Sequence, residues 1–226
     1  KLSAHGVHTA YDLRHAHVPT LRAEFGVVME KIQRELQEIA CIDLQEIQPD
    51  RQQIISSRSF GSMVTELPVL QDALSTFVAN ACAKLRAQNS HAAVIQVFLQ
   101  TNRFRKDLPQ YMPSLAVPLP YPTNDSLEVN RWASYLCERM FKPDYQYKKA
   151  GIMLSEISPI THLQGDLLEP ETTSNSRLML ALDTLNQRYG RGTVKVSTQG
   201  AFKDWQMRQE RRSPNYTTDW DEVPVV

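Results

Sequence analysis

The first part of the chain has apolar residues at helical intervals. Between Gly6 and about Leu44, one face of short helices is marked by Leu13, Val18, Leu21, Phe25, Val28, Met29, Ile32 and Leu36. The stretch EIQPDRQQ then breaks the pattern, because Pro49 and Asp50 favour a turning or extended backbone. We therefore predict a small helical domain over residues 1–48 and a linker over residues 49–53.

The middle of the chain alternates between strand-like and helix-like patterns. β-Branched residues and polar–apolar alternation predict strands in QQIISSRSF (52–60), AAVIQVFLQT (92–101), SLAVPLP (114–120) and YKKAGIMLS (147–155). Apolar stripes predict one helix that begins near Pro68 and another that follows Asp125, with a capping box between Asp125 and Glu128. The order β-α-β-β-α-β predicts a ferredoxin-like domain over residues 54–157, in which two helices cover one face of a four-stranded antiparallel sheet.

The other face of this predicted sheet is left for water or a partner. We expect it to carry Arg58, Gln96 and Thr101, and Pro118 favours an edge position for the third strand. On the fold alone, a solvated face without a partner is the plainer interpretation.

The last part of the chain begins with a polar stretch. Residues 158–176 are rich in Pro, Glu, Thr, Ser and Asn, which predicts an exposed linker. RLMLALDTLNQRYGRG then predicts a helix that ends near Gly190, and TVKVS predicts a short strand. We expect a small α/β C-terminal region over residues 177–226, so the fold class of the whole chain is α+β.

Composition narrows the class of protein. The 226 residues are 42% hydrophobic and 22% charged, which is ordinary for a soluble globular protein. Since 25 basic residues balance 25 acidic ones, any polyanion site must be local. The three cysteines form no CxxC pair, which favours the cytoplasm over a disulfide framework, and no apolar run is long enough to predict contact with a membrane core.

No catalytic group stands out in the sequence. No phosphate-binding loop of the GxxxxGK[ST] or GxGxxG type occurs. The N-terminal histidines share no predicted face with cysteine or carboxylate partners, so we interpret them as surface residues and expect no metal site: His5, His8, His15 and His17. Cys41, Cys82 and Cys137 lie in helical patterns and are interpreted as small buried residues. We predict no cofactor for this chain.

Nucleic-acid binding has more support. SSRS (56–59) and TNRFRK (101–106) combine small hydroxyl or amide donors with arginine, the groups that contact phosphate oxygens without reading base sequence. From these residues alone, solvated strand ends are an equally good interpretation.

Several segments carry a family resemblance along essentially the whole chain. They are IISSRSFG (54–61), KLRAQN, YQYKKAGIMLSEISP (145–159), LMLALDTLNQRYGRGTV (178–194) and WQMRQERRSPNYTTDWDEVP (205–224). Together they resemble the later part of UmuC-like, also MucB- and RumB-like, Y-family translesion DNA polymerases, the SOS-induced and error-prone catalytic subunits of the polymerase V type.

The resemblance assigns each part of the chain to a domain of the polymerase family. Residues 1–48 resemble the end of the thumb, residues 54–157 the little finger and residues 177–226 the UmuC-type C-terminal region. The metal-binding carboxylates of the palm have no counterpart here, so we expect that this chain does not polymerise by itself and that Mg²⁺ belongs to the full-length polymerase.

The resemblance also implies binding residues. The family's little finger grips the backbone of template–primer DNA, which assigns DNA contacts to Ser57, Arg58 and Ser59 and, by position, to Thr101, Asn102 and Arg103. The family carries a peptide for the bacterial sliding clamp after the little finger, which matches Gln164, Leu167 and Leu168. Gly165 and Leu168 depart from the usual Gln-Leu-x-Leu-Phe pattern, and two leucines that fold back on their own domain are the alternative.

Further partners follow from the family alone. They are a UmuD′-like subunit and RecA, in a cytoplasmic, nucleoid-associated setting in bacteria. A different class of protein remains open on the residues: an interaction module whose sheet binds a protein and no DNA.

Overall fold

The computed structural model describes the chain except for residues 44–48, 163–174, 201–204, 208–212, 219 and 224–226. It contains two compact units, Lys1–Pro49 and Asp50–Val226. We describe each unit by itself.

The first unit consists of short helices, as the apolar periodicity predicts. They are η1 (Leu2–His5), α1 (Ala10–His15), α2 (Val18–Phe25) and α3 (Val27–Leu36). Gly6 and Gly26 separate them with positive φ angles of 74° and 81°, which glycine adopts without steric strain. The buried carboxylate of Glu30 holds α2 and α3 together by accepting from Arg22 at 3.1 Å, and it also pairs with Arg34 at 2.6 Å.

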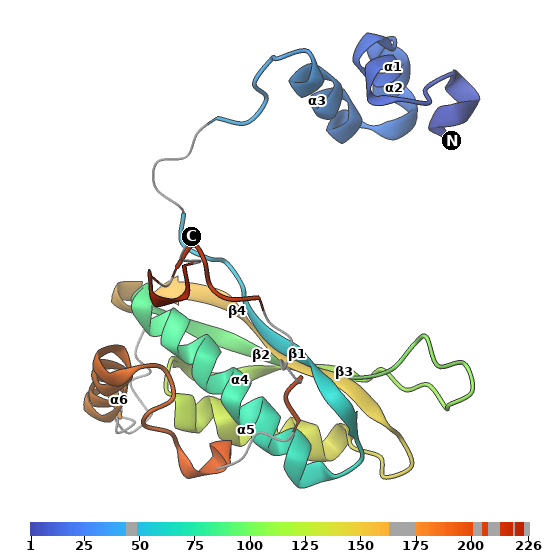
Figure 1. The fold of residues 1–226 in the computed structure, drawn as a ribbon. Helices are drawn as coiled ribbons and strands as arrows, with labels where there is room; N and C mark the ends of the chain where they lie inside the picture. Colours follow the sequence, from blue (N-terminus) through green and yellow to red (C-terminus); the bar gives the residue numbers. More distant parts are fainter. Residues whose placement is uncertain (44–48, 163–174, 201–204, 208–212, 219, 224–226) are drawn as a thin grey trace. The chain divides into compact units, whose positions relative to one another are not determined.

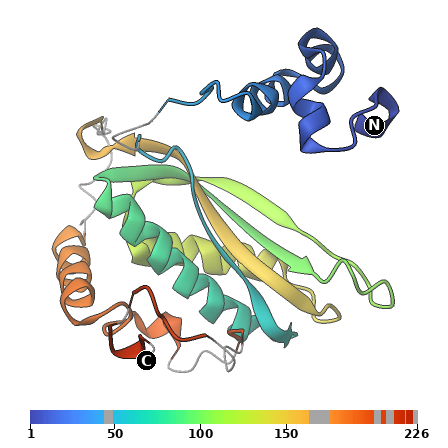
Figure 2. The ribbon, with the colours of Figure 1, turned by 45° about the horizontal axis from the view of Figure 1, so that its top comes forward.

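The second unit contains the predicted ferredoxin-like domain. Its elements are β1 (Ile54–Val64), α4 (Leu67–Ala87), β2 (Ser90–Thr101), β3 (Ser114–Thr123), α5 (Ser126–Met140) and β4 (Tyr147–Pro159). The sheet order is β1-β4-β2-β3, and all neighbouring strands are antiparallel. Helices α4 and α5 lie across one face of the sheet (Figures 1 and 2). The prediction of a four-stranded sheet with two helices on one face is confirmed.

The core lies between the sheet and these two helices. Burial alternates along β2, so that Ile95, Val97 and Leu99 face the helices. They pack with the buried apolar side chains of the other elements, which include Ile54, Phe60, Leu70, Leu74, Phe77, Leu85, Leu136, Ile152 and Leu154. Pro118 lies in β3, an edge strand, as predicted.

Three local expectations are wrong in detail. Thr101 was expected on the open face, but its side chain is 6% exposed and lies on the helix-covered side. Arg58 was expected there too, but it pairs in register with the buried Ala150 and therefore points to the helix-covered side. Of the three expected residues, only Gln96 lies on the open face. The Asp125 side chain accepts from the Leu127 N–H at 2.8 Å and caps α5. Glu128 does not complete a capping box, because it accepts from the side chains of Arg131 and Trp132.

The C-terminal region folds against the ferredoxin-like domain. Its regular elements among the described residues are α6 (Ser176–Tyr189), η3 (Ser197–Gln199) and η4 (Trp220–Glu222). The predicted strand TVKVS does not form, because the Asn186 side chain bonds to the backbone beside it. Its Oδ1 accepts from the N–H groups of Gly192 at 3.1 Å and Val194 at 3.0 Å, and its Nδ2 donates to the Val194 carbonyl at 2.9 Å.

Trp205 attaches this region to the core. Its ring is 2% exposed and makes edge contacts with Phe60 and Phe77, while its Nε1 donates to Asp72 Oδ2 at 3.1 Å. Its carbonyl accepts from the Gly61 N–H on β1 at 3.0 Å. A Cβ at Gly61 would lie 2.4 Å from the Gln206 carbonyl oxygen, so only glycine lets the two backbones approach this closely.

Candidate nucleic-acid interface

The open face of the sheet includes three adjacent rows of residues that lie side by side across the strands. Strand register defines the rows as Ile55, Met153, Gln96 and Ala116; then Ser57, Gly151, Phe98 and Ser114; then Ser59, Lys149 and Gln100. Residues that pair directly across antiparallel strands point to the same face. Beside apolar residues, these rows contain hydroxyl and amide groups, one cation and no carboxylate.

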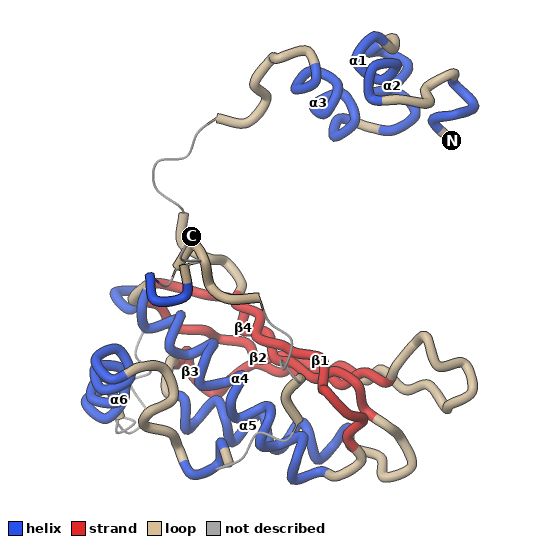
Figure 3. The backbone as a smooth tube through the Cα atoms, in the orientation of Figure 1, coloured by secondary structure: helices blue, strands red, loops and turns tan. Residues whose placement is uncertain are grey.

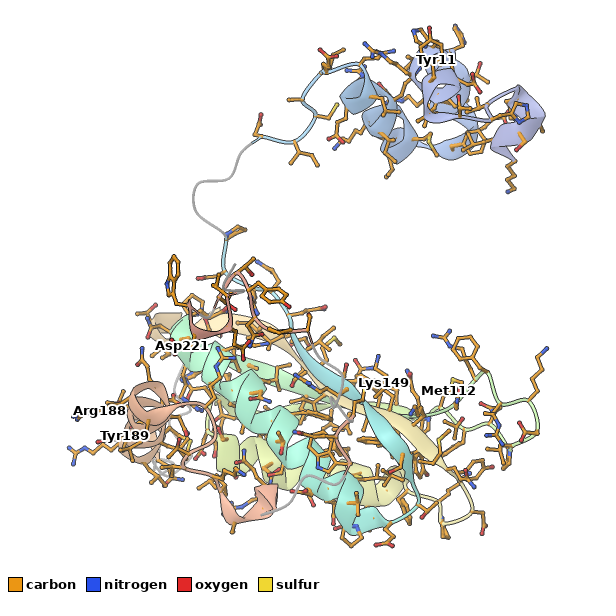
Figure 4. All side chains as sticks on the ribbon, viewed as in Figure 1. Tyr11, Met112, Lys149, Arg188, Tyr189 and Asp221 are labelled. Atoms are coloured by element: carbon orange, nitrogen blue, oxygen red, sulfur yellow. The ribbon has the colours of Figure 1, made fainter. Side chains whose placement is uncertain are left out.

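The middle row is organised around Gly151. A Cβ at this position would lie 2.3 Å from Ser57 Cβ and 2.4 Å from Phe98 Cζ, so the Phe98 ring covers the glycine. The Lys149 ammonium lies 5.8 Å from the centre of the same ring, within the range of a cation–π contact. Figure 4 labels Lys149 on its strand. The open face therefore presents a fixed aromatic ring beside its lysine.

Donors for phosphate oxygens surround this pair. Ser57 and Ser59 of β1 lie beside Gly151 and Lys149 of β4, respectively. Gln100 of β2 lies on the other side of Lys149. The Gln96 amide already donates to Ser114 Oγ at 2.7 Å. Hydroxyls, amides and lysine are the groups that contact a nucleic-acid backbone without reading base sequence.

The loop between β2 and β3 extends beyond the end of the sheet (Figure 3). Gln110 holds it together by donating to the carbonyls of Asn102, Arg105 and Leu108 at 2.9 to 3.2 Å. Phe104 is 84% exposed, and the Arg103 guanidinium lies 5.7 Å from the centre of its ring. The loop thus offers an exposed cation and an exposed aromatic ring.

Not every cation in this loop is available to a ligand. Arg105 donates to both carboxylate oxygens of Asp107, and this hydrogen bonding lowers the pKa of Asp107 to about 2. The pair therefore stays charged and closed over the ordinary pH range. Arg103 and Lys106 have no ion pair among the described residues of the loop.

The structure separates the residues that the resemblance assigned to DNA. Ser57 and Ser59 lie on the open face, whereas Arg58 points to the other side of the sheet. Thr101 is buried and uses its hydroxyl inside the protein, donating to Gln110 at 2.9 Å and accepting from the Tyr111 N–H at 3.1 Å. Asn102 accepts from the Phe104 N–H, and Arg103 is exposed. Gln164, Leu167 and Leu168 lie outside the described residues.

Sequence reasoning missed Phe98 and Lys149. Phe98 lies in the predicted strand 92–101 and Lys149 in the predicted strand 147–155, so the sequence did place both residues in the sheet. The sequence alone did not show that these two side chains lie on the open face, because the face that a side chain takes depends on strand register, which a single sequence does not fix.

The described residues include two buried cysteines and no cluster of metal ligands. Burial raises the pKa of the Cys82 and Cys137 thiols to about 12, which keeps them protonated. No three His, Cys, Asp or Glu side chains within the described part of the chain gather as metal ligands. Among the same residues, no helix has the length and apolar content that a bilayer crossing needs.

The fold and this face define a ferredoxin-like domain whose open sheet face mixes polar and apolar residues and bears one lysine in its three central rows, with a docked C-terminal region. Residues 51–167 match the impB/mucB/samB family C-terminal domain, and residues 176–226 match a domain of unknown function, DUF4113. The chain belongs to the impB/mucB/samB family.

Individual relatives agree with this assignment. ImpB of Salmonella typhimurium is 35% identical over 229 residues, which cover 100% of this chain and 54% of that protein. UmuC of the LT2 strain of the same species is 34% identical, covering 99% of this chain and 53% of that protein. MucB of Escherichia coli is 37% identical, covering 100% and 53%. The chain spans about half the length of these relatives.

One solved structure is also similar. An insertion ternary complex of Dbh DNA polymerase aligns with a TM-score of 0.38 and 14% sequence identity, covering 70% of this chain and 43% of that one. The fold described above stands on its own strand order and does not depend on this likeness.

Proposed function

We propose that this chain is the DNA-gripping and clamp-docking part of a UmuC-like translesion DNA polymerase. The observation that carries the proposal is the open face, whose three rows combine hydroxyls, amides and Lys149 and include no carboxylate. Membership of the impB/mucB/samB family and the resemblance of its members to Y-family polymerases supply the class of ligand, which is template–primer DNA.

The mode of contact follows from the side chains. Ser57, Ser59 and Gln100 donate to phosphate oxygens, and Lys149 contributes charge at the same place. Arg103 approaches the same backbone from the β2–β3 loop. Such contacts read no base sequence, which suits a polymerase that copies past damaged bases. Arg58 faces away from this surface, so it contributes less to duplex binding than Lys149.

The test is binding of a fluorescein-labelled template–primer duplex, followed by anisotropy over a range of salt concentrations. We expect Lys149→Glu and Arg103→Glu each to weaken binding, and a neutral change at Lys149 to lower the slope of log affinity against log salt by about one. Arg188→Glu is the matched control, because Arg188 lies on α6 and points into solvent (Figure 4).

Two outcomes would count against DNA gripping. Equal losses in Lys149→Glu and Arg188→Glu would show that only overall charge matters. No measurable binding by the unmodified chain would favour the alternative class, a protein-interaction module that uses the same sheet without DNA.

Clamp docking is the second part of the proposal. Gln164, Leu167 and Leu168 lie at the junction between the two matched segments, since the first match ends at residue 167 and the second begins at residue 176. Each leucine that becomes fully buried in a clamp pocket contributes about 1.5 to 3 kcal/mol, from which the cost of ordering the peptide is subtracted. We expect modest affinity for the bacterial sliding clamp.

Its test compares the unmodified chain with a variant in which Gln164, Leu167 and Leu168 are all alanine. Loss of binding to labelled clamp in the variant supports the docking peptide. Equal binding by the two chains would remove clamp docking from the proposal and leave DNA gripping untouched. Contacts with a UmuD′-like subunit and with RecA belong to the same proposal, as does Mg²⁺ at a palm outside this chain.

A further inference from the structure

A second basic surface lies on the other side of β1. A cleft of about 590 Å³ is bounded by β1, by α4 and by the segment that follows α6. Figure 2 shows α6 and that segment alongside α4. The described residues that line the cleft include Arg58, Lys84, Arg191 and Lys195, and none of the described lining residues is aspartate or glutamate.

These four cations have no partner in the part of the chain that the structure describes. All four are exposed, and no ion pair or hydrogen bond there involves their side chains. Arg86 also lines the cleft, but its guanidinium is bonded to Asp183, to the Asn124 carbonyl and to Ser126. The cleft therefore carries unneutralised positive charge from three separate elements, which favours an anionic ligand.

The cleft also contains an unsatisfied polar group. Thr76 lines it, is 9% exposed and has a hydroxyl without a hydrogen-bond partner. Buried hydroxyls in native proteins nearly always find a partner. A ligand that enters the cleft with hydrogen-bonding atoms would satisfy Thr76, together with the nearby amide of Asn80.

The outer edge of β1 forms one wall of the cleft. Four consecutive residues, Ile55 to Arg58, line it, although the side chains of Ile55 and Ser57 belong to the open face. These two residues therefore present backbone to the cleft. Further along the strand, the Gly61 N–H already donates outward to the Trp205 carbonyl. An edge strand with unpaired backbone groups is a template for one more strand.

We propose that this cleft binds an extended, carboxylate-bearing segment of a partner protein. The segment adds to the outer edge of β1 beside Ile55–Arg58. Because side chains alternate along a strand, aspartate or glutamate at every second position meets Arg58, Lys84, Arg191 and Lys195. The intervening side chains turn toward the open-face side of the sheet.

A single nucleic-acid strand fits these observations less well. Sequence-tolerant binding of single strands relies on aromatic faces on which bases stack. Among the described residues that line the cleft, the only aromatic side chain is that of Phe77, which is 2% exposed and packed against Trp205. The described lining residues offer charge and strand-pairing groups and no exposed aromatic face.

The test uses the full chain and a labelled peptide of about ten residues in which glutamate alternates with threonine, the length of a long natural strand. Arg58→Glu and Arg191→Glu are each expected to weaken peptide binding by about tenfold or more, because each places a negative charge in the cleft. The matched controls are Arg103→Glu on the β2–β3 loop and Arg188→Glu on α6. They make the same charge change outside the cleft and should bind the peptide like the unmodified chain. Unchanged melting temperatures would show that all four variants fold.

Two further probes separate the alternatives. Two further peptides keep the same charges and carry N-methyl groups on alternate residues, one at the odd positions and one at the even positions. One of the two should bind about tenfold more weakly than the other, because its methyl groups replace the N–H groups that pair with β1. Equal binding of both methylated peptides, or equal losses in the cleft and control variants, would overturn strand addition. Binding of oligothymidylate that is lost in Arg58→Glu, with no binding of the peptide, would make the cleft a nucleic-acid site and overturn the proposal. These outcomes are independent of duplex binding by the open face, which Lys149→Glu tests.

Discussion

The ferredoxin-like domain and the C-terminal region are held in different ways. The domain, Ile54–Pro159, has a continuous core that draws buried side chains from all four strands and both helices. The described part of the C-terminal region contributes only two buried apolar side chains, Met179 and Trp205, and reaches the domain through a few separate contacts.

Those contacts are specific. Besides Trp205, Asp183 of α6 accepts two hydrogen bonds from Arg86 of α4, at 2.6 and 2.8 Å. The Thr198 hydroxyl lies 2.8 Å from Ser75 Oγ and accepts from Asn130 at 3.2 Å. A continuous core spreads its stability over many side chains, whereas point contacts concentrate it in few. Single substitutions should therefore detach the C-terminal region and leave the domain folded.

The largest effect is expected from Trp205→Ala. The substitution removes a buried indole that touches Phe60 and Phe77, at a cost of about 3 to 5 kcal/mol in the free energy that holds the region in place. Limited proteolysis should cut after residue 159 much faster than in the unmodified chain, while the domain persists as a stable fragment. Trp220→Ala is the control, since Trp220 is 93% exposed. Equal protease resistance of the two variants would contradict the point-contact description.

Gly151→Ala tests the domain itself. The added Cβ meets Ser57 and Phe98 at distances that real contacts never show, so strands must shift at a cost of about 1 to 3 kcal/mol. Urea denaturation should show a lower midpoint for the whole domain, with no separate release of the C-terminal region. Phe98 is displaced from the open face, so duplex DNA binding should fall as well. A variant with unchanged stability would mean that Phe98 does not rest on the glycine.

Asp183→Asn weakens the second contact of the C-terminal region. Arg86 is mostly buried and loses its charged acceptor, which should cost about 1 to 2 kcal/mol. Proteolysis should again release the region first, but more slowly than for Trp205→Ala. Asp107→Asn is the matched control, because its bidentate partner Arg105 is on an exposed loop, and no change in protease resistance is expected there.

The smallest effect concerns the cysteines, which report whether the core of the domain is closed. At pH 8, well below the pKa of about 12 for Cys82 and Cys137, both thiols stay protonated and should react with a thiol reagent only after denaturant is added. Cys41, in the helical first unit and partly exposed, should react at once. Fast reaction of all three cysteines in the native chain would show that the core opens readily.

Much of the domain was predictable because its patterns are local. β-Branched alternation and helical stripes locate the strands and helices of the ferredoxin-like order, and an edge proline marks β3. The sequence did not predict which face of the sheet Arg58 and Thr101 point to, since a register shift of one residue moves every side chain of a strand to the opposite face.

The C-terminal region shows the other limit. Trp205 lies in a polar, charged tail, and nothing in its neighbours says that its partners are Phe60 and Phe77, far away in sequence. TVKVS has strand propensity, but a single side chain, Asn186, takes its backbone groups. Long-range packing decided both outcomes, and propensity is a weak guide where packing competes with it.

The prolines of β3 have a consequence for how molecules behave at high concentration. Pro118, Pro120 and Pro122 stand at alternate positions of an edge strand, and none of them has an N–H to donate. A ladder with another molecule needs N–H donors, so the half of β3 that carries these prolines is a poor partner for a further strand. Intermolecular pairing through this part of β3 is therefore disfavoured in the folded chain at high protein concentration.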